Sequence, residues 1–283
     1  MKAVVINKPG GLDNIAIVER SNPVPKASEV LVKWHATSLN FHDYLVAVGG
    51  IPVEDGRVPM SDGAGEVIGV GESVTKWKVG DKVMALFFPN WIEGTPTLPK
   101  TRFISGETVD GYVVEQSCLS EEAVTAIPDG YTYAEAATIP CAGLTAWRAL
   151  VTEGKLKSGD TVLIEGTGGM SIFGLQIALA AGATVYATTS SEAKAARLKE
   201  MGVKAVVNYK EDEKKKKTIF KMSGGGVDHV LDVGGGSTMH NSIEAAKMSG
   251  CFDKVIVSTE DSEIAEVAES YGAEVPFRRP LNL

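Results

Sequence analysis

The sequence predicts an α/β protein in two parts, a β-rich first part and a second part built on a doubly wound parallel sheet. In residues 1 to about 122, many short β-branched runs are separated by Gly and Pro, a pattern typical of a compact, barrel-like β domain. From about residue 123 to 250, strand-like runs alternate with helical patterns. This alternation favours parallel strands joined by crossover helices.

The element boundaries follow from the spacing of apolar residues and from the Gly and Pro positions between them. In the first part, the expected strands are Lys2–Ile6, Ile15–Glu19, Glu29–Ala36, Gly65–Val70, Lys82–Phe87 and Gly111–Val114. In the second part, the expected strands are Thr161–Glu165, Thr184–Thr189, Ala205–Asn208 and Val227–Val233. The expected helices are Tyr133–Pro140, Gly143–Thr152, Met170–Ala181, Glu192–Met201, part of Glu211–Met222, and Thr238–Met248.

A glycine-rich turn after the strand at Thr161–Glu165 predicts a dinucleotide site. Glycines let the backbone turn tightly and approach a pyrophosphate, and the N-terminus of the following helix offers free N–H groups. A serine stands where the G-x-G-x-x-G pattern would have its third glycine. The alternative is a purely structural turn between a strand and a helix. The residues expected to contact the cofactor here are Gly166, Thr167, Gly168, Gly169, Met170 and Ser171.

The end of the second strand of this unit favours NADP(H). An NAD site usually has Asp or Glu there, on the ribose 2′-hydroxyl. This chain has hydroxyl side chains instead, followed by Ser190 and then Lys194, which would accept a 2′-phosphate. Ser191 could equally cap a helix, with Lys194 as a solvated first-turn residue. Tyr209 could pack on the adenine, reach the 2′-phosphate, or fill a gap at the strand end.

Composition excludes several classes of function. The chain has 283 residues with 44% hydrophobic and 23% charged residues, as in an ordinary globular protein. Its net charge of −8 gives no basic field for nucleic acid, and the run Lys214–Lys217 follows three acidic residues. No run is long and apolar enough to predict a membrane span. Three separated cysteines suit a reducing, cytoplasmic location.

Several stretches, taken together and in order, resemble the medium-chain dehydrogenase/reductase superfamily, and most closely its zinc-independent, quinone-oxidoreductase-like branch. The resemblance covers residues 1 to about 250. The stretches are SEVLVKWHATSLNFHDYL (Ser28–Leu45), MSDGAGEVIGVGESVTKWKVGDKV (Met60–Val83), FFPNW (Phe87–Trp91), AATIPCAGLTAWRAL (Ala136–Leu150), the glycine turn, VVNY (Val206–Tyr209) and GVDHVLDVGGG (Gly226–Gly236).

The resemblance implies a GroES-like domain over residues 1–122 and a Rossmann-type domain over 123–250. Zinc-dependent members hold a catalytic metal with Cys, His and Cys. Here Asn40 stands at the first ligand position, and Met60-Ser61-Asp62 replaces Gly-His-Glu. Only Cys141 stands at a ligand position, so we expect no metal. His35 and His42 are expected to be polar or half-buried residues rather than ligands.

Without zinc, the nicotinamide would carry the hydride, and the protein would orient it in a dry pocket. By resemblance, Asn40 and Asp43 line the cleft, although Asp43 and Asp62 could instead bond backbone in turns. Tyr44 is a candidate proton donor or simply a packed aromatic residue. Trp91 and Trp147 are expected to shape the pocket or the core, and for Trp147 the core is favoured. Thr145 and Gly234 are further residues that the resemblance places at the cofactor.

The resemblance ends near Gly250. Residues 252–281 resemble a segment of cytidylyltransferases that activate acidic sugars, but their N-terminal nucleotide motif is missing, so no transferase activity is inferred. The tail, 251–283, should form a strand at Lys254–Ser258, a helix at Ser262–Ser270 and a strand at Ala273–Phe277. It stands where the family has its C-terminal return to the first domain and a dimer edge.

The sequence therefore predicts an NADP(H)-dependent, zinc-independent oxidoreductase acting on a quinone, an enone or a related carbonyl compound, possibly as a homodimer. One alternative is a zinc-free member acting on alcohols or aldehydes. Another is a dinucleotide-binding protein whose catalysis is impaired by the replaced tail. A sugar-nucleotide enzyme is supported only by the tail.

Overall fold

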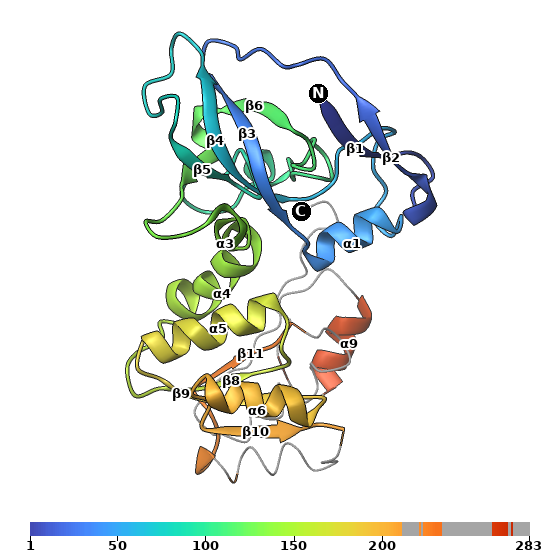
Figure 1. Cartoon of the computed structure of the whole chain (residues 1–283). Helices are drawn as coiled ribbons and strands as arrows, with labels where there is room; N and C mark the ends of the chain where they lie inside the picture. Colours follow the sequence, from blue (N-terminus) through green and yellow to red (C-terminus); the bar gives the residue numbers. More distant parts are fainter. Residues whose placement is uncertain (211–220, 222, 234–261, 271–272, 274–283) are drawn as a thin grey trace. The chain divides into compact units, whose positions relative to one another are not determined.

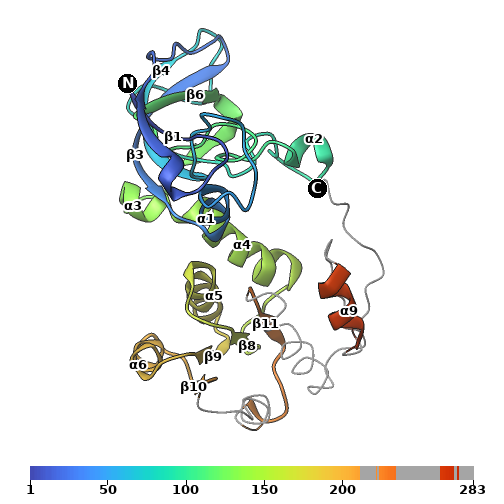
Figure 2. The same cartoon turned by 90° about the vertical axis from the view of Figure 1, so that its right-hand side faces the viewer.

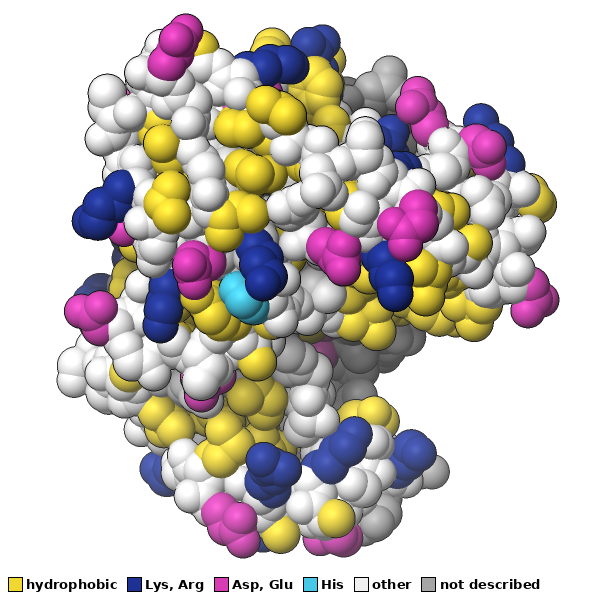
Figure 3. Space-filling model, turned by 45° about the horizontal axis from the view of Figure 1, so that its top comes forward, with side chains coloured by type: hydrophobic (Ala, Val, Ile, Leu, Met, Phe, Trp, Pro, Cys, Tyr) yellow, Lys and Arg dark blue, Asp and Glu magenta, His cyan; other side chains and the backbone are white. Residues whose placement is uncertain are grey.

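The computed structural model describes residues 1–210, 221, 223–233, 262–270 and 273. It divides into two compact units, Met1–Ala142 and Gly143–Leu283, each described here by itself (Figure 1). The first unit is mainly β and the second is α/β, as the sequence predicts. On the face of the molecule in Figure 3, acidic and basic side chains are interspersed rather than gathered by sign.

The first unit is built on a five-stranded antiparallel sheet in the order β6-β3-β4-β5-β7. Its strands are β3 (Glu29–Ser38), β4 (Asp62–Val70), β5 (Lys82–Ala85), β6 (Gln116–Ser120) and β7 (Val124–Ala126). A separate hairpin pairs β1 (Lys2–Ile6) with β2 (Ile15–Glu19). Alternating residues of β3 point into the core because successive side chains leave opposite faces of a strand. Buried members of this core are Val30, Val32, Trp34, Val67, Val83 and Tyr112.

Irregular pairing between β3 and β4 brings the site residues together. The register shifts between Trp34 and Ala36, and the two strands end with Ser38 opposite Asp62. Gly65 sits at this irregularity, where a Cβ would lie 2.2 Å from the carbonyl oxygen of Lys33. Only glycine allows the strands to approach this closely.

The helices of the first unit are short. They are α1 (Phe41–Ala47), α2 (Leu98–Thr101) and α3 (Tyr133–Ala136), followed by a π-helical turn at Ile139–Gly143. Two 3₁₀ turns lie at Leu12–Asn14 and Glu121–Ala123. Thr132 and Glu135 form a capping box that starts α3. The segment between β5 and β6 carries α2 and is otherwise irregular, as its Thr- and Pro-rich sequence indicates.

The second unit contains a four-stranded parallel sheet in the order β10-β9-β8-β11 (Figure 2). The strands are β8 (Thr161–Ile164), β9 (Thr184–Thr189), β10 (Ala205–Asn208) and β11 (His229–Leu231). The helices are α4 (Leu144–Trp147), a π-helical stretch at Arg148–Glu153, α5 (Gly169–Ala180) and α6 (Glu192–Glu200). From β8, the chain first adds β9 and β10 on one side of the sheet and then adds β11 on the other side. Sheets of this kind bind ligands at the C-terminal ends of the strands where the direction changes, which here is the end of β8.

Most of the predicted elements are confirmed within a few residues, and the differences have local causes. Gly111–Val114 is not a strand, because only Val114 forms an isolated bridge, with Ala3, while Gly111 packs on the backbone of Pro59 and Met60. The elements α1, α2, β6 and β7 and the two 3₁₀ turns were not predicted. Of the predicted strand Val227–Val233, only His229–Leu231 pairs with β8.

In the tail, helix α9 (Ser262–Ser270) is confirmed. The expected helices at Glu211–Met222 and Thr238–Met248 and the expected strand at Lys254–Ser258 lie largely or wholly outside the described residues, as does Ala273–Phe277 apart from its first residue. Across the residues that are described, no helix combines the length and the apolar character needed to cross a membrane.

Candidate functional site

The first turn of α1 is tied to the start of β4 through Asp43. One oxygen of this buried carboxylate, Oδ2, accepts the backbone N–H of Asn40 at 2.8 Å, and the other, Oδ1, accepts the backbone N–H of Ser61 at 2.8 Å. Asn40 is the residue that precedes the helix, and it forms a capping box with Asp43. The pair therefore both starts the helix and anchors it to the sheet.

The side-chain amide of Asn40 is held by a polar network at the ends of β3 and β4. Its Nδ2 donates to Asp62 Oδ2 at 2.9 Å and to Ser61 Oγ at 3.2 Å. Asp62 Oδ2 also accepts from the hydroxyl of Ser38 at 3.1 Å. Both donor protons of the Asn40 amide thus already have acceptors within the protein.

Asp62 is fully buried, and its second oxygen, Oδ1, has no hydrogen-bond partner among the described residues. Burial raises the pKa of this carboxyl to about 6, against the opposing hydrogen bonds from Asn40 and Ser38. The charge of Asp43 also raises it.

Cys141, in the π-helical turn after α3, is close to the same carboxyls. Burial raises the pKa of its thiol to about 12, and the charges of Asp62 and Asp43 act in the same direction. A thiol with this pKa is neutral at physiological pH and is therefore not an attacking thiolate.

The backbone just before this network is strained. Met60 has a φ of +76°, a conformation that few residues other than glycine adopt. Its carbonyl oxygen accepts the N–H of Tyr112 at 3.0 Å, and Gly111 packs so closely that a Cβ there would lie 2.1 Å from that oxygen. The surrounding contacts hold this conformation beside the candidate site, where such strain commonly occurs.

Other predicted residues of the first unit lie outside this network. Tyr44 is 49% exposed on α1 and contacts the ring of Phe41, and its hydroxyl has no hydrogen bond to any described residue. His42 is half-buried and bonded to Glu107, while His35 stacks on the ring of Tyr133. His42 is thus half-buried, as expected, whereas His35 is exposed.

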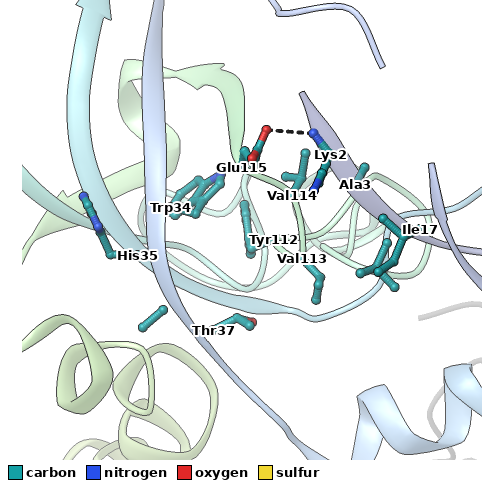
Figure 4. A pocket seen from close by; sticks show the side chains of 12 residues that line it. Lys2, Ala3, Ile17, Trp34, His35, Thr37, Tyr112, Val113, Val114 and Glu115 are labelled. Carbon is teal, nitrogen blue, oxygen red and sulfur yellow. Dashed lines mark hydrogen bonds between the residues drawn. The ribbon is translucent and has the colours of Figure 1, made fainter. Parts of the chain in front are cut away.

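A pocket of about 350 Å³ in the first unit lies beside β3 and β1, and none of the predicted site residues lines it (Figure 4). Its wall is mainly apolar, and two of the polar groups in it have partners within the protein. The backbone N–H of Lys2 donates to the carboxylate of Glu115, and the indole N–H of Trp34 donates to Ser117. This pocket offers no converging polar groups for substrate chemistry.

In the second unit, the glycine turn has the shape that a pyrophosphate needs. Gly166 has a φ of +76°, and a Cβ at Gly166 or Gly168 would meet no atom within 4 Å. The first intrahelical hydrogen bond of α5 runs from the Ile172 N–H to the Gly168 carbonyl, and no side chain caps the helix. The N–H groups of the preceding turn are the ones that bind anions at a helix N-terminus.

The remaining residues of the turn have different environments. Ser171 is buried, and its hydroxyl donates to the Glu165 carbonyl at 2.9 Å, so this side chain stabilises the turn itself. Met170 packs against the core, whereas Gly169 is exposed and Thr167 is partly exposed. Thr145, on α4, is exposed.

At the end of β9, no carboxylate occupies the strand. Thr188 accepts the Gly166 N–H at 3.2 Å, and Thr189 is buried with a hydroxyl that bonds to none of the residues that the structure describes. Ser190 is partly exposed and Lys194 exposed. Ser191 caps α6 by accepting the Lys194 N–H.

Three further predicted positions complete this comparison. Tyr209 is 42% exposed after β10, and Gly234 lies outside the described residues. Trp147 is 51% exposed on α4. The preference for a core position of Trp147 is therefore wrong, because Ala146 of α4 and Leu150 of the following π-helical stretch are the buried residues here.

Comparisons with known proteins agree with this architecture. Residues 26–129 match the family model of the alcohol dehydrogenase GroES-like domain, and residues 169–247 match that of zinc-binding dehydrogenases. A zinc-type alcohol dehydrogenase-like protein of Schizosaccharomyces pombe is 38% identical over 261 residues, which are 90% of this chain and 75% of that protein. The chain belongs to the medium-chain dehydrogenase/reductase superfamily.

Solved structures of this superfamily have the same fold. A putative alcohol dehydrogenase from Sinorhizobium meliloti 1021 superposes with a TM-score of 0.82 and 35% identity, covering 91% of this chain and 75% of that one. The quinone oxidoreductase from Coxiella burnetii gives a TM-score of 0.74 and 26% identity, covering 99% and 82%. The chain is thus an oxidoreductase of a dinucleotide-binding family with small-molecule substrates.

The tail has a second similarity. Residues 230–281 match the family model of cytidylyltransferases, in agreement with the resemblance seen in the sequence. Within this match, the structure describes residues 230–233, 262–270 and 273.

Zinc-type members of the superfamily imply a metal, and the donor set of this chain does not fit one. A tetrahedral zinc site needs lone pairs from three protein ligands and an open position. Asn40 directs N–H donors, not lone pairs, toward Ser61 and Asp62. Among the described residues, no three His, Cys, Asp or Glu side chains gather closely enough to hold a metal.

Sequence reasoning named Asn40 and Asp43 but did not join them to Ser38, Ser61 and Asp62. The sequence signal that could have grouped these residues is the presence of two carboxyls, Asp43 shortly after β3 and Asp62 at the start of β4. These segments lie 18 or more residues apart in the chain, and only their pairing in the sheet makes them neighbours.

Proposed function

We propose that this chain is an NADP(H)-dependent, zinc-independent reductase that transfers hydride to a quinone, an enone or a related carbonyl compound. The observation that carries the proposal is the open glycine turn at the N-terminus of α5, with Gly166 and Gly168 free of neighbouring atoms. Such a turn accommodates the pyrophosphate of a dinucleotide. Similarity to the Coxiella burnetii quinone oxidoreductase supports the substrate class.

The preference for NADP(H) rests on the end of β9. A 2′-phosphate carries negative charge, and here it would meet Ser190 and Lys194 rather than an acid at the strand end. The carboxylate of Glu192, the first residue of α6, accepts a hydrogen bond from Asn208 at 3.3 Å and is thereby directed toward β10. Tyr209 would lie at the edge of this site.

The absence of zinc from the reaction is supported by the Asn40 network. When bound, the nicotinamide would supply the hydride. Asn40, Asp43 and Asp62 would then shape one wall of the substrate site and hold α1 in place. Tyr44 is the proposed proton donor, because its phenol is partly exposed and unbonded to described residues. Thr145, Gly169 and Gly234 would contact the cofactor.

A fluorescence titration with NADPH, NADH and CTP tests the binding step. We expect NADPH to bind at least tenfold more tightly than NADH, and CTP not to bind. Tighter binding of NADH would overturn the preference for NADPH. Binding of CTP alone would favour the sugar-nucleotide alternative suggested by the tail.

Assays of NADPH oxidation with a quinone, an enone and an aldehyde test the reaction, with and without a chelator. Turnover of the quinone or enone that is unchanged by the chelator, in protein without bound zinc, supports the proposal. Loss of turnover in the chelator, restored by zinc, would contradict it. NADPH binding without turnover of any of these compounds would favour the non-catalytic alternative.

Lys194→Ala separates the role of Lys194 from a general effect of charge. We expect it to weaken NADPH binding about tenfold and to leave NADH binding unchanged, since a surface lysine on a phosphate gives about 1 kcal/mol. Lys199→Ala, in the last turn of the same helix, is the matched control. Equal effects of the two substitutions would exclude a 2′-phosphate contact.

A homodimer and a cytoplasmic location are further proposals that size-exclusion chromatography and imaging can test.

A further inference from the structure

His42 lies between two carboxylates that come from different parts of the first unit. Its Nε2 is 2.7 Å from Glu107 Oε2, and its Nδ1 is 3.5 Å from Asp43 Oδ1. The side chains of His42 and Glu107 are 18% and 20% exposed. This pair therefore joins α1 to a segment 65 residues further along the chain, in surroundings that screen charges less than the surface does.

Glu107 belongs to a tight turn, Ile104–Val109, which touches the other segments of the candidate site. The N–H groups of Thr108 and Val109 donate to the Ile104 carbonyl. Ser105 is buried and bonds to Tyr112 through its hydroxyl and to Phe87 through its N–H. A Cβ at Gly106 would lie 2.9 Å from the backbone nitrogen of Met60, so the turn packs directly on the strained residue before Ser61.

The surroundings of His42 favour its charged form. Burial alone would lower the pKa of the imidazole, but the hydrogen bonds and charges of Asp43 and Glu107 outweigh it and raise the pKa to about 9. Asp43, on α1, and Glu107, on the turn, are the charged groups that face the ring. Phe87, which follows β5, contributes an uncharged ring edge at 5.4 Å.

We propose that His42 and Glu107 form a charge-dependent latch, in which protonated His42 holds the turn Ile104–Val109 against the first turn of α1 and so positions Asn40 and Asp43 next to Ser61. In this role His42 is a positioning residue, not a catalytic one, because both of its ring nitrogens face carboxylates of the protein. The functional consequence rests on the proposed reductase activity, but the latch itself does not.

The direction of the pH effect follows from the chemistry of the imidazole. A protonated ring carries a positive charge that attracts both carboxylates, although its Nδ1 makes no hydrogen bond to a described residue, whereas a neutral ring keeps at most the hydrogen bond between Nε2 and Glu107. Because the pKa of His42 is raised, the latch is complete below about pH 6.5 and is lost as the pH rises through about 9. Above that pH the turn should separate from α1 more often.

Amide hydrogen exchange on the full chain tests the latch without using activity. We expect the protection of the amides of Gly106, Thr108 and Val109, corrected for intrinsic exchange, to fall about tenfold between pH 7 and pH 10 in the wild-type protein. Amides in the pairing of β3 with β4 serve as the internal reference. Equal protection at both pH values would overturn the proposal without any need for a variant.

Substitutions then assign the effect to the pair. Glu107→Gln and His42→Gln should each lower protection of the turn about tenfold at pH 7 and remove its pH dependence, and the double variant should add little more. Glu54→Gln, which removes an exposed partner of Arg57, is the matched control. If the control has the same effect, or if the two single effects simply add, the latch is wrong. Failure of NADPH to bind would refute the proposed function and leave these exchange results unaffected.

Discussion

Asp43 and Ser61 are joined by a buried hydrogen bond of 2.8 Å, from the Ser61 backbone N–H to the Asp43 carboxylate. The bond connects the first turn of α1 to the residue before β4. Since the other oxygen of Asp43 accepts the Asn40 N–H, one buried side chain fixes two segments at once. Two oriented backbone N–H groups thus stabilise this carboxylate, and the His42 ring faces it at 3.5 Å.

Asp43→Asn should destabilise the protein by about 2 kcal/mol, because an amide can accept only one of the two backbone N–H groups and points its own N–H₂ toward the other. Urea unfolding at pH 7 measures the change. Asp13→Asn, at an exposed position in the 3₁₀ turn after β1, is the control and should have almost no effect. A change at Asp43 as small as that of the control would show that the two bonds contribute little.

Asp62→Asn should remove a pH dependence of stability. The pKa of Asp62 is raised in the folded protein from 3.8 to about 6, so its contribution is fully present below about pH 3.8 and is lost as the pH rises through about 6. The wild-type protein should therefore lose up to about 3 kcal/mol relative to the variant between pH 4 and pH 7. Unfolding of both proteins in urea across this range gives the difference, which would be flat if Asp62 titrates normally.

Gly168→Ala should weaken NADPH binding about tenfold while leaving the fold intact. The backbone at Gly168 has a φ of −72°, which alanine adopts freely, and no protein atom lies within 4 Å of the added methyl group. That space is the one a pyrophosphate would need. Fluorescence titration gives the affinity, and thermal unfolding should show no loss of stability.

Gly69→Ala in β4 is the matched control for that substitution. Its methyl group would make only ordinary contact with Leu31, at 3.4 Å, and it should change neither NADPH affinity nor the unfolding temperature by much. Unchanged NADPH affinity in Gly168→Ala would mean that the turn does not face the cofactor.

Much of the second unit could be predicted from the sequence because its signals are local. The strand at Thr184–Thr189 agrees in both bounds, and α5 and α6 begin within one residue of the expected positions. Gly166 needs a positive φ, and Ser191 caps its helix, so each residue reports its own backbone geometry. The position of Trp147 was misjudged, because the pattern of apolar residues around it predicts a helix but does not indicate which face of that helix is buried.

In the first unit, local patterns predicted strands β1 to β5 but not β6, β7 or the site. The sequence by itself determined the β-rich and α/β halves, the glycine turn and the weak fit to zinc, since these depend on residue type and short-range spacing. Only the tertiary structure decided that Asp62 is buried with an unpaired oxygen, that Asn40 donates to it, and that His42 meets Glu107. The irregular pairing of β3 with β4 and the turn at Gly106 bring segments together that are distant in the sequence. The hydrogen bonds and the burial of these side chains therefore depend on contacts between residues that are not neighbours in the chain.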